Sequence, residues 1–150
     1  LVLIAASPRY LDDRDYHGGL TEQVLGDIHM AMCLNYPGWA HEYARAAMGN
    51  PDQPQLHEYF ARHLGGIAPE RAASTLFTIL ESDHRSDLAK VGVPTLIVQS
   101  REDVAVPMAV ARYLHEHIRH SQLAVIEATG HLPHLSAPQA VVEAMRQFGV

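Results

Sequence analysis

The stretch VPTLIVQSREDVAVP, residues 93–107, combines a buried strand, an acidic residue and a helix start. Its segment 94–99 is almost continuously apolar, which is typical of a strand covered on both faces in a parallel sheet. Asp103 follows this strand, and Pro107 can occupy the first turn of a helix, where its missing N–H does no harm. The stretch therefore predicts a strand, a loop that presents a carboxylate, and a helix.

Two further apolar runs predict strands, LVLIAA at residues 1–6 and QLAVIE at residues 122–127. Helical patterns follow the two later strands, the first after Pro107 and the second from Ser136, where Gln139 completes a capping box. The apolar residues that these helices should bury are Val110, Ala111, Leu114 and Ile118 in the first and Val141, Val142, Met145 and Phe148 in the second. Strand, helix, strand and helix in this order predict right-handed parallel crossovers.

The roughly ninety residues between the first two strands contain no strand signal, and a plain connection of that length is uncommon in a compact domain. Residues 38–48 and 55–64 are weak helix candidates, separated by the Gly-Asn-Pro breaker at 49–51. Two stronger helical stripes are formed by Val24, Leu25, Ile28 and Met32 and, after Pro69, by Ala72, Ala73, Leu76, Phe77 and Leu80. We therefore expect about four helices inserted into a parallel sheet.

The composition favours a folded domain and argues against nucleic acid as a partner. With 47% apolar residues, the chain can bury a substantial core. Lys and Arg number 11 against 17 for Asp and Glu, which gives a net charge of −6, and the basic residues are scattered singly. The single Cys33 lies in a helical pattern, so we expect a small buried hydrophobe and a reducing cytoplasm.

The apolar run at residues 1–7 is neither a targeting signal nor a membrane span. It has no basic flank and is too short to cross a bilayer, so we expect no membrane association. A chain that begins inside a buried strand is expected to be a fragment of a longer protein.

Asp103 and His131 are the residues best placed to carry chemistry. Catalytic groups gather beyond the carboxyl ends of parallel strands, and these two residues follow the second and third predicted strands. A carboxylate beside an imidazole fixes its tautomer and stabilises the imidazolium that forms when it takes a proton from a nucleophile. Each residue also has a structural interpretation, Asp103 as a turn former or helix cap and His131 as a loop residue. Their joint placement raises the weight of the catalytic interpretation.

No metal site is predicted from the 11 histidines or from the acidic cluster at residues 12–15. An H-E-x-x-H motif needs a second His, which is missing after His41-Glu42, His57-Glu58 and His115-Glu116. The acidic cluster lacks the spacing and the Glu of an EF-hand loop, so we expect a turn there.

Six phrases occur along the chain: SPRYLDD (7–13), DYHGGL (15–20), NYPGWA (35–40), SDHRSDL (82–88), VPTLIVQSREDVAVP (93–107) and GHLPHLSAP (130–138). Together they closely resemble the RsbQ-like α/β-hydrolases, a group that includes a bacterial stress regulator and the plant strigolactone and karrikin receptors. The resemblance implies the α/β fold class, as the C-terminal part of a three-layer sandwich. Residues 1–7 are then a core strand, 8–88 a lid insertion, and 89–150 the last core strands and helices.

By this resemblance Asp103 is the acid and His131 the base of a serine hydrolase triad, with His134 as a structural neighbour. The substrate is an ester or lactone-like small molecule, and no cofactor is needed. A V-shaped lid of four helices covers a mostly apolar pocket, whose matching positions are Tyr10, Trp39, Tyr43, Ile79, Ser82, Ala105 and Leu132. Ordinary packing between helices is the alternative for Trp39 and Tyr43.

The nucleophile of such a triad is missing from the chain. In the family it is a Ser in a G-x-S-x-G-type turn, and no Ser of this sequence has Gly two residues away on both sides. The family places this turn, and the loop that supplies the oxyanion-hole amides, before the strand at which the chain starts. We therefore expect both in an N-terminal part of a longer protein, and no activity from the chain alone.

Two other functions stay open at this point. The resembled group includes receptors and a regulator that acts with a phosphatase, so the chain can belong to a ligand-binding signalling module with a protein partner. It can also be an interaction fragment without activity. Receptor and hydrolase share the triad and the lid, so these motifs do not separate them.

Overall fold

Three parallel strands form the sheet of the computed structural model, which describes residues 1–149. Ile4 lies opposite Val98, and β1 ends there because Ala5 has a φ of 48°, outside the extended region. The strands are β1 (Val2–Ile4), β2 (Thr95–Glu102) and β3 (Ser121–Thr129), in the order β1-β2-β3. All three predicted strands are present, but β1 is shorter than its predicted range of 1–6, whereas β2 and β3 continue beyond their predicted carboxyl ends.

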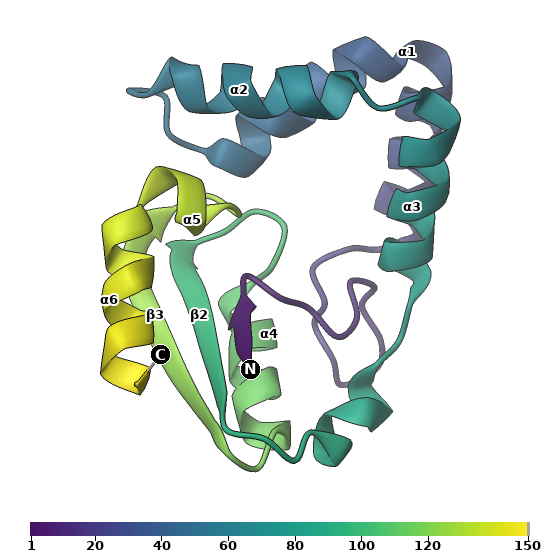
Figure 1. Ribbon diagram of the computed structural model, residues 1–150. Coiled ribbons are helices and arrows are strands. Elements are labelled where there is room, and N and C mark those ends of the chain that lie inside the picture. The colour runs from purple at the N-terminus through teal and green to yellow at the C-terminus, as the bar shows by residue number, and fades with distance from the viewer. Residues whose placement is uncertain (150) are drawn as a thin grey trace.

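Helices cover both faces of this sheet, which explains why β2 is almost continuously apolar. Ile97 points to the face covered by α4 (Met108–His117). Leu96 and Val98 point to the opposite face, where they pack against α6 (Pro138–Phe148). The sheet therefore lies between two helical layers, as Figure 1 shows and as the sequence predicts. All four apolar residues predicted for the α4 stripe are buried.

The second predicted helix is divided, and its predicted start is wrong. A short helix, α5 (Pro133–Ser136), precedes α6, whose N-cap residue Ala137 makes no capping hydrogen bond through its side chain. The Ser136 hydroxyl donates to the carbonyl of Thr129 (3.3 Å) instead of capping α6. Pro138 starts the helix, because a residue in the first turn needs no N–H donor.

Three residues that the sequence places on the buried faces of helices are exposed, namely Val24, Cys33 and Val142. Val142 is 43% exposed, because Val141 faces the sheet and the next residue lies about 100° further around the helix. Cys33 is exposed for the same reason, as the neighbour of the buried Met32. The stripes were predicted in the right place, but their width was overestimated.

The region between β1 and β2 is helical, as predicted. Two predicted segments are joined in α1, which is kinked where Asn35 leaves the helical conformation (φ −156°, ψ 78°), and Pro37 explains the kink because it has no N–H to donate. The helices are α1 (Glu22–Met48), α2 (Pro54–Gly65) and α3 (Pro69–Glu81), followed by the 3₁₀ helix η1 (Arg85–Lys90). In Figure 1, α2 lies beyond the carboxyl ends of β2 and β3, and α3 runs along one side. Within residues 1–149, no helix combines the length and apolar character that a membrane crossing requires.

Ion pairs connect the segment that precedes this helical region with the segment that follows it. Arg85 donates to Asp13 (2.8 Å) and to Asp83 (2.7 Å), and Arg9 donates to Asp83 (3.2 Å). The hydrogen bond from Arg85 lowers the pKa of Asp83 to about 2. The acidic cluster at 12–15 therefore makes turn and ion-pair contacts, as expected for a turn.

Candidate active site

Asp103 lies in the loop after β2, and its side chain is fully buried. Its Oδ1 atom accepts hydrogen bonds from the backbone N–H groups of Ala105 (2.9 Å) and Val106 (3.0 Å). This is the pattern of an Asx turn, so the turn-former interpretation of Asp103 also holds. The Oδ2 atom faces other side chains and accepts a hydrogen bond from Nε2 of Gln99 (3.1 Å).

His131 follows β3 and reaches the same carboxylate, with 3.1 Å between its Nδ1 atom and Oδ2 of Asp103. The expected contact between the two side chains is therefore present. The backbone N–H of His131 donates to the carbonyl of Ala47 (2.7 Å) in α1, and the N–H of Gly130 donates to the carbonyl of Glu102 (2.7 Å). His131 is thus held between the strand ends and the helical region, with 17% of its side chain exposed.

The charge of Asp103 determines the tautomer of His131. Burial raises the pKa of Asp103, but the hydrogen bond and charge of His131, together with the N–H groups of Ala105 and Val106, outweigh it and lower the pKa overall. The carboxylate is therefore ionised at neutral pH and only accepts hydrogen bonds. His131 then carries its proton on Nδ1, which leaves Nε2 able to take a proton from a nucleophile.

A cavity of about 190 Å³ lies between the helical region and the loop that carries Asp103. Four predicted pocket residues, Tyr10, Trp39, Tyr43 and Ala105, are part of its wall. The wall is completed by Leu20, Ile28, Leu76, Leu80 and Val104. The helical stripes contain Ile28, Leu76 and Leu80, so their inward orientation was predictable, whereas no sequence signal marked Leu20 or Val104.

Three other residues expected along the pocket do not line this cavity. Ile79 is 44% exposed, because the neighbouring Leu80 takes the inward position on α3. Ser82 caps the end of α3, and its hydroxyl donates to the carbonyl of Ile79 (2.8 Å). Leu132 is the N-cap residue of α5, and its carbonyl accepts a hydrogen bond from the N–H of Leu135 (2.9 Å).

The aromatic residues of the wall are stacked on one another. The rings of Trp39 and Tyr43 are 5.3 Å apart and almost parallel, with an interplanar angle of 3°. Trp39 and Tyr43 therefore pack against each other and also line the cavity. Burial, with smaller contributions from Tyr10 and Asp103, raises the pKa of Tyr43 to about 12, so its hydroxyl stays protonated at neutral pH.

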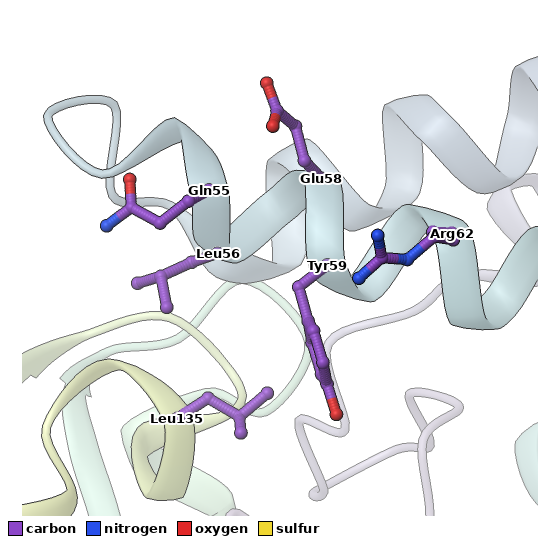
Figure 2. Close-up of a pocket in the computed structure, with 6 residues that line it drawn as sticks. All are labelled: Gln55, Leu56, Glu58, Tyr59, Arg62 and Leu135. Atoms are coloured by element: carbon purple, nitrogen blue, oxygen red, sulfur yellow. The ribbon is translucent and has the colours of Figure 1, made fainter.

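A larger hollow of about 510 Å³ lies between α2 and α5 (Figure 2). Leu56 and Tyr59 point from α2 toward the side on which Leu135 lies, and Arg62 adds a charged group. In the described part of the chain, none of the predicted site residues lines this hollow. We therefore place the candidate ligand site in the smaller cavity, whose wall includes Ala105 from the Asp103 loop. Among residues 1–149, no three His, Cys, Asp or Glu side chains gather as a metal site requires.

The sequence profile described as "Alpha/beta hydrolase family" matches residues 2–144. The chain belongs to this alpha/beta hydrolase family. A solved hydrolase from Oleispira antarctica has the same fold, with a TM-score of 0.93 and 30% sequence identity, over 98% of this chain and 54% of that chain. The predicted fold class, part of an α/β-hydrolase, is therefore confirmed.

Two plant relatives of this chain carry esterase names. A probable esterase of Oryza sativa subsp. japonica is 43% identical over 143 residues, which are 95% of this chain and 53% of the relative. A strigolactone esterase of Arabidopsis thaliana is 38% identical over 148 residues, 98% of this chain and 55% of the relative. The resemblance to the plant members of the group is thus confirmed. The chain spans about half the length of these relatives.

Proposed function

We propose that this chain supplies the acid and the base of a serine hydrolase. The observation that carries the proposal is the 3.1 Å contact between Nδ1 of His131 and the fully buried carboxylate of Asp103. Asp103 holds the imidazole in the tautomer whose Nε2 atom is a base. The loop of Asp103 also contributes its next two residues, Val104 and Ala105, to the wall of a cavity.

In the proposed reaction, Nε2 of His131 takes the proton of a Ser hydroxyl while the Ser oxygen attacks an ester or lactone-like carbonyl. The imidazolium, stabilised by Asp103, then returns this proton to the leaving alkoxide, and water releases the acyl group by the same route. The Ser comes from outside these residues, since no Ser of the chain lies in a G-x-S-x-G turn. No cofactor takes part.

The cavity supports a small apolar ligand with a few polar groups as the substrate. Its wall is mostly aliphatic and aromatic, and the lining side chains that carry a polar group are Tyr10, Tyr43 and Trp39. Burial raises the pKa of both phenols, so both are neutral hydrogen-bond donors or acceptors at physiological pH. Such a surface suits an ester or lactone better than a charged metabolite.

We assign residues 8–88 to a lid over this cavity, and residues 1–7 and 89–150, of which residue 150 lies outside the described part of the chain, to the core. The N–H of His84 donates to the carbonyl of Pro8 (2.8 Å), which brings the two ends of the segment together as an insertion requires. The hydrogen bond between His131 and Ala47 joins the segment to the catalytic pair. We also propose a cytoplasmic location, in keeping with the single unpaired Cys33.

The 150-residue chain expressed alone is expected to show no His131-dependent turnover of a p-nitrophenyl ester, whereas the full-length gene product that contains it should hydrolyse this ester. A general base acts only on a hydroxyl held within about 3 Å, and each missing oxyanion-hole donor costs roughly 10²- to 10³-fold in kcat. Release of p-nitrophenolate measures both. Turnover by the chain alone that is abolished by His131→Ala would show that one of its own serines, or Cys33, is the nucleophile.

A ligand-binding signalling module with a protein partner is the second candidate function. It is supported by relatives named as receptors, such as "Karrikin insensitive 2 receptor CA" of Petunia hybrida, which is 39% identical over 95% of this chain and 53% of the relative. Ligand binding by the full-length gene product without hydrolysis would favour this candidate.

Trp39→Ala is expected to weaken binding of a naphthyl ether probe to the full-length gene product about tenfold or more, because the change removes a large aromatic part of the cavity wall. Fluorescence titration measures the affinity. Tyr59→Ala is the matched control, since Tyr59 is an aromatic residue of α2 that is 47% exposed and lies outside this cavity. Equal affinities of the two variants would leave Trp39 with a packing role only.

A further inference from the structure

Gln99 is a buried amide whose hydrogen bonds are all on one side. It lies in β2, four residues before Asp103, and is 1% exposed. Its Nε2 atom donates to Oδ2 of Asp103 (3.1 Å) and to the carbonyl of Val106 (3.2 Å). Its Oε1 atom is buried and has no hydrogen-bond partner within residues 1–149.

The amide of Gln99 can adopt only this orientation. The ionised carboxylate of Asp103 and the backbone carbonyl of Val106 are both acceptors without a proton, so the nitrogen must face them. The opposite orientation would bring oxygen against oxygen. Burial of Oε1 without a donor costs free energy that an apolar side chain of similar size would avoid. An apolar residue at this position could not donate hydrogen bonds to the loop that carries Asp103, whereas Gln99 donates two.

We propose that Gln99 is a positioning residue for the Asp103–His131 pair, a role that rests on the hydrolase function proposed above. Two backbone N–H groups fix Oδ1 of Asp103, but they leave the carboxylate free to pivot about that atom. Gln99 fixes Oδ2, the atom that accepts the hydrogen bond from His131. The second N–H of its amide holds the Val106 carbonyl, which ties the loop to the strand that carries it.

The kinetic test is Gln99→Met in the full-length gene product, because Met keeps the length of the side chain and removes both donors. We expect kcat on a p-nitrophenyl ester to fall about tenfold to 100-fold, with a much smaller change in KM, since a carboxylate that pivots misplaces the base while most of the cavity wall lies on other segments. Thr95→Val is the matched control. Thr95 is fully buried in the same strand, and its hydroxyl donates to the carbonyl of Val93 (3.0 Å), at the other end of β2 from Asp103. The control should keep the wild-type kcat.

The second measurement is the proton resonance of Nδ1 of His131, which does not depend on turnover. We expect a slowly exchanging low-field signal in the wild type and in Thr95→Val, and a broadened or lost signal in Gln99→Met. A protein without esterase activity that still shows this pattern would contradict the hydrolase function but retain the role of Gln99. An unchanged signal or an unchanged kcat in folded Gln99→Met would overturn that role, as would an equal loss in Thr95→Val.

Gln99→Glu replaces the first variant if Gln99→Met does not fold. The introduced carboxyl has nearly the same shape and can donate to Asp103 only while it is protonated. The Nδ1 signal should therefore persist at low pH and disappear as the pH rises through the pKa of the introduced group, over a range in which the wild-type signal is constant. A signal that persists throughout this range would overturn the proposal.

Discussion

His131→Ala is expected to lower kcat/KM of the full-length gene product on an ester substrate about 10⁴- to 10⁶-fold. The loss is large because the same imidazole takes the proton of the nucleophile and then delivers it to the leaving group. Its Nδ1 atom lies 3.1 Å from the Asp103 carboxylate, and within residues 1–149 His131 is the basic side chain that hydrogen-bonds to this carboxylate. Initial rates of p-nitrophenyl ester hydrolysis measure the effect.

Two further variants test why activity is lost when His131 is replaced. Asp103→Asn should lower kcat about 10⁴-fold, because an amide that donates to Nδ1 favours the wrong tautomer of the imidazole. His134→Ala should keep nearly full activity, because His134 is an exposed residue of α5 that lies only three positions further along the chain. An equal loss in His134→Ala and His131→Ala would contradict the assignment of the base to His131.

Gly130→Ala is expected to destabilise the folded protein by about 2–5 kcal/mol, the sum of backbone strain and overpacking. Gly130 has a φ of 102°, which L-residues with a side chain rarely adopt. A Cβ atom at this position would lie 2.9 Å from the carbonyl carbon of Met48 and 3.0 Å from the carbonyl oxygen of Ala47. Both atoms belong to the backbone of α1 and cannot rotate away. Urea unfolding measures the change in the free energy of unfolding.

The same substitution should also lower activity, because the carbonyl of Ala47 accepts the backbone hydrogen bond of His131. Gly26→Ala is the control, and it is expected to raise the free energy of unfolding rather than lower it. Gly26 lies inside α1, and apart from its chain neighbours and the adjacent helix backbone no atom lies within 4 Å of an added Cβ, so Ala should stabilise the protein by about 0.5–1 kcal/mol. A Gly130→Ala protein as stable as the wild type would show that the close packing of Gly130 on α1 is absent in solution.

Local sequence patterns predicted an element correctly where the same kind of neighbour packs against it along its whole length. The strand β2 is covered on both faces, so its apolar run alone identified it. The contact between Asp103 and His131 was also predictable, because parallel strands end at one edge of a sheet and the two residues follow neighbouring strands. Strand order and loop position sufficed for this expectation.

Element boundaries and the exact buried face depended on packing between segments that are distant in the chain. The pattern around Ser136 is a valid capping box, yet its hydroxyl bonds to the end of β3 and α6 starts at Pro138. A helical stripe likewise leaves its edge residues ambiguous by one position, about 100° around the helix, and Cys33 and Val142 fell on the exposed side. Which face of a helix is buried depends on the segment that packs against it, and that segment can be distant in the sequence.

By itself, the sequence determined the parallel sheet, the helical insertion and the two chemical groups at the strand ends, because each depends on residues close together in the chain. Only the tertiary structure decided which side chains enclose the cavity and what surrounds the Asp103 carboxylate. Gln99 illustrates the difference: along the chain it is one polar residue at the end of an apolar run. It becomes a hydrogen-bond donor to Asp103 because the loop after β2 folds back over the strand and brings two acceptors to its amide.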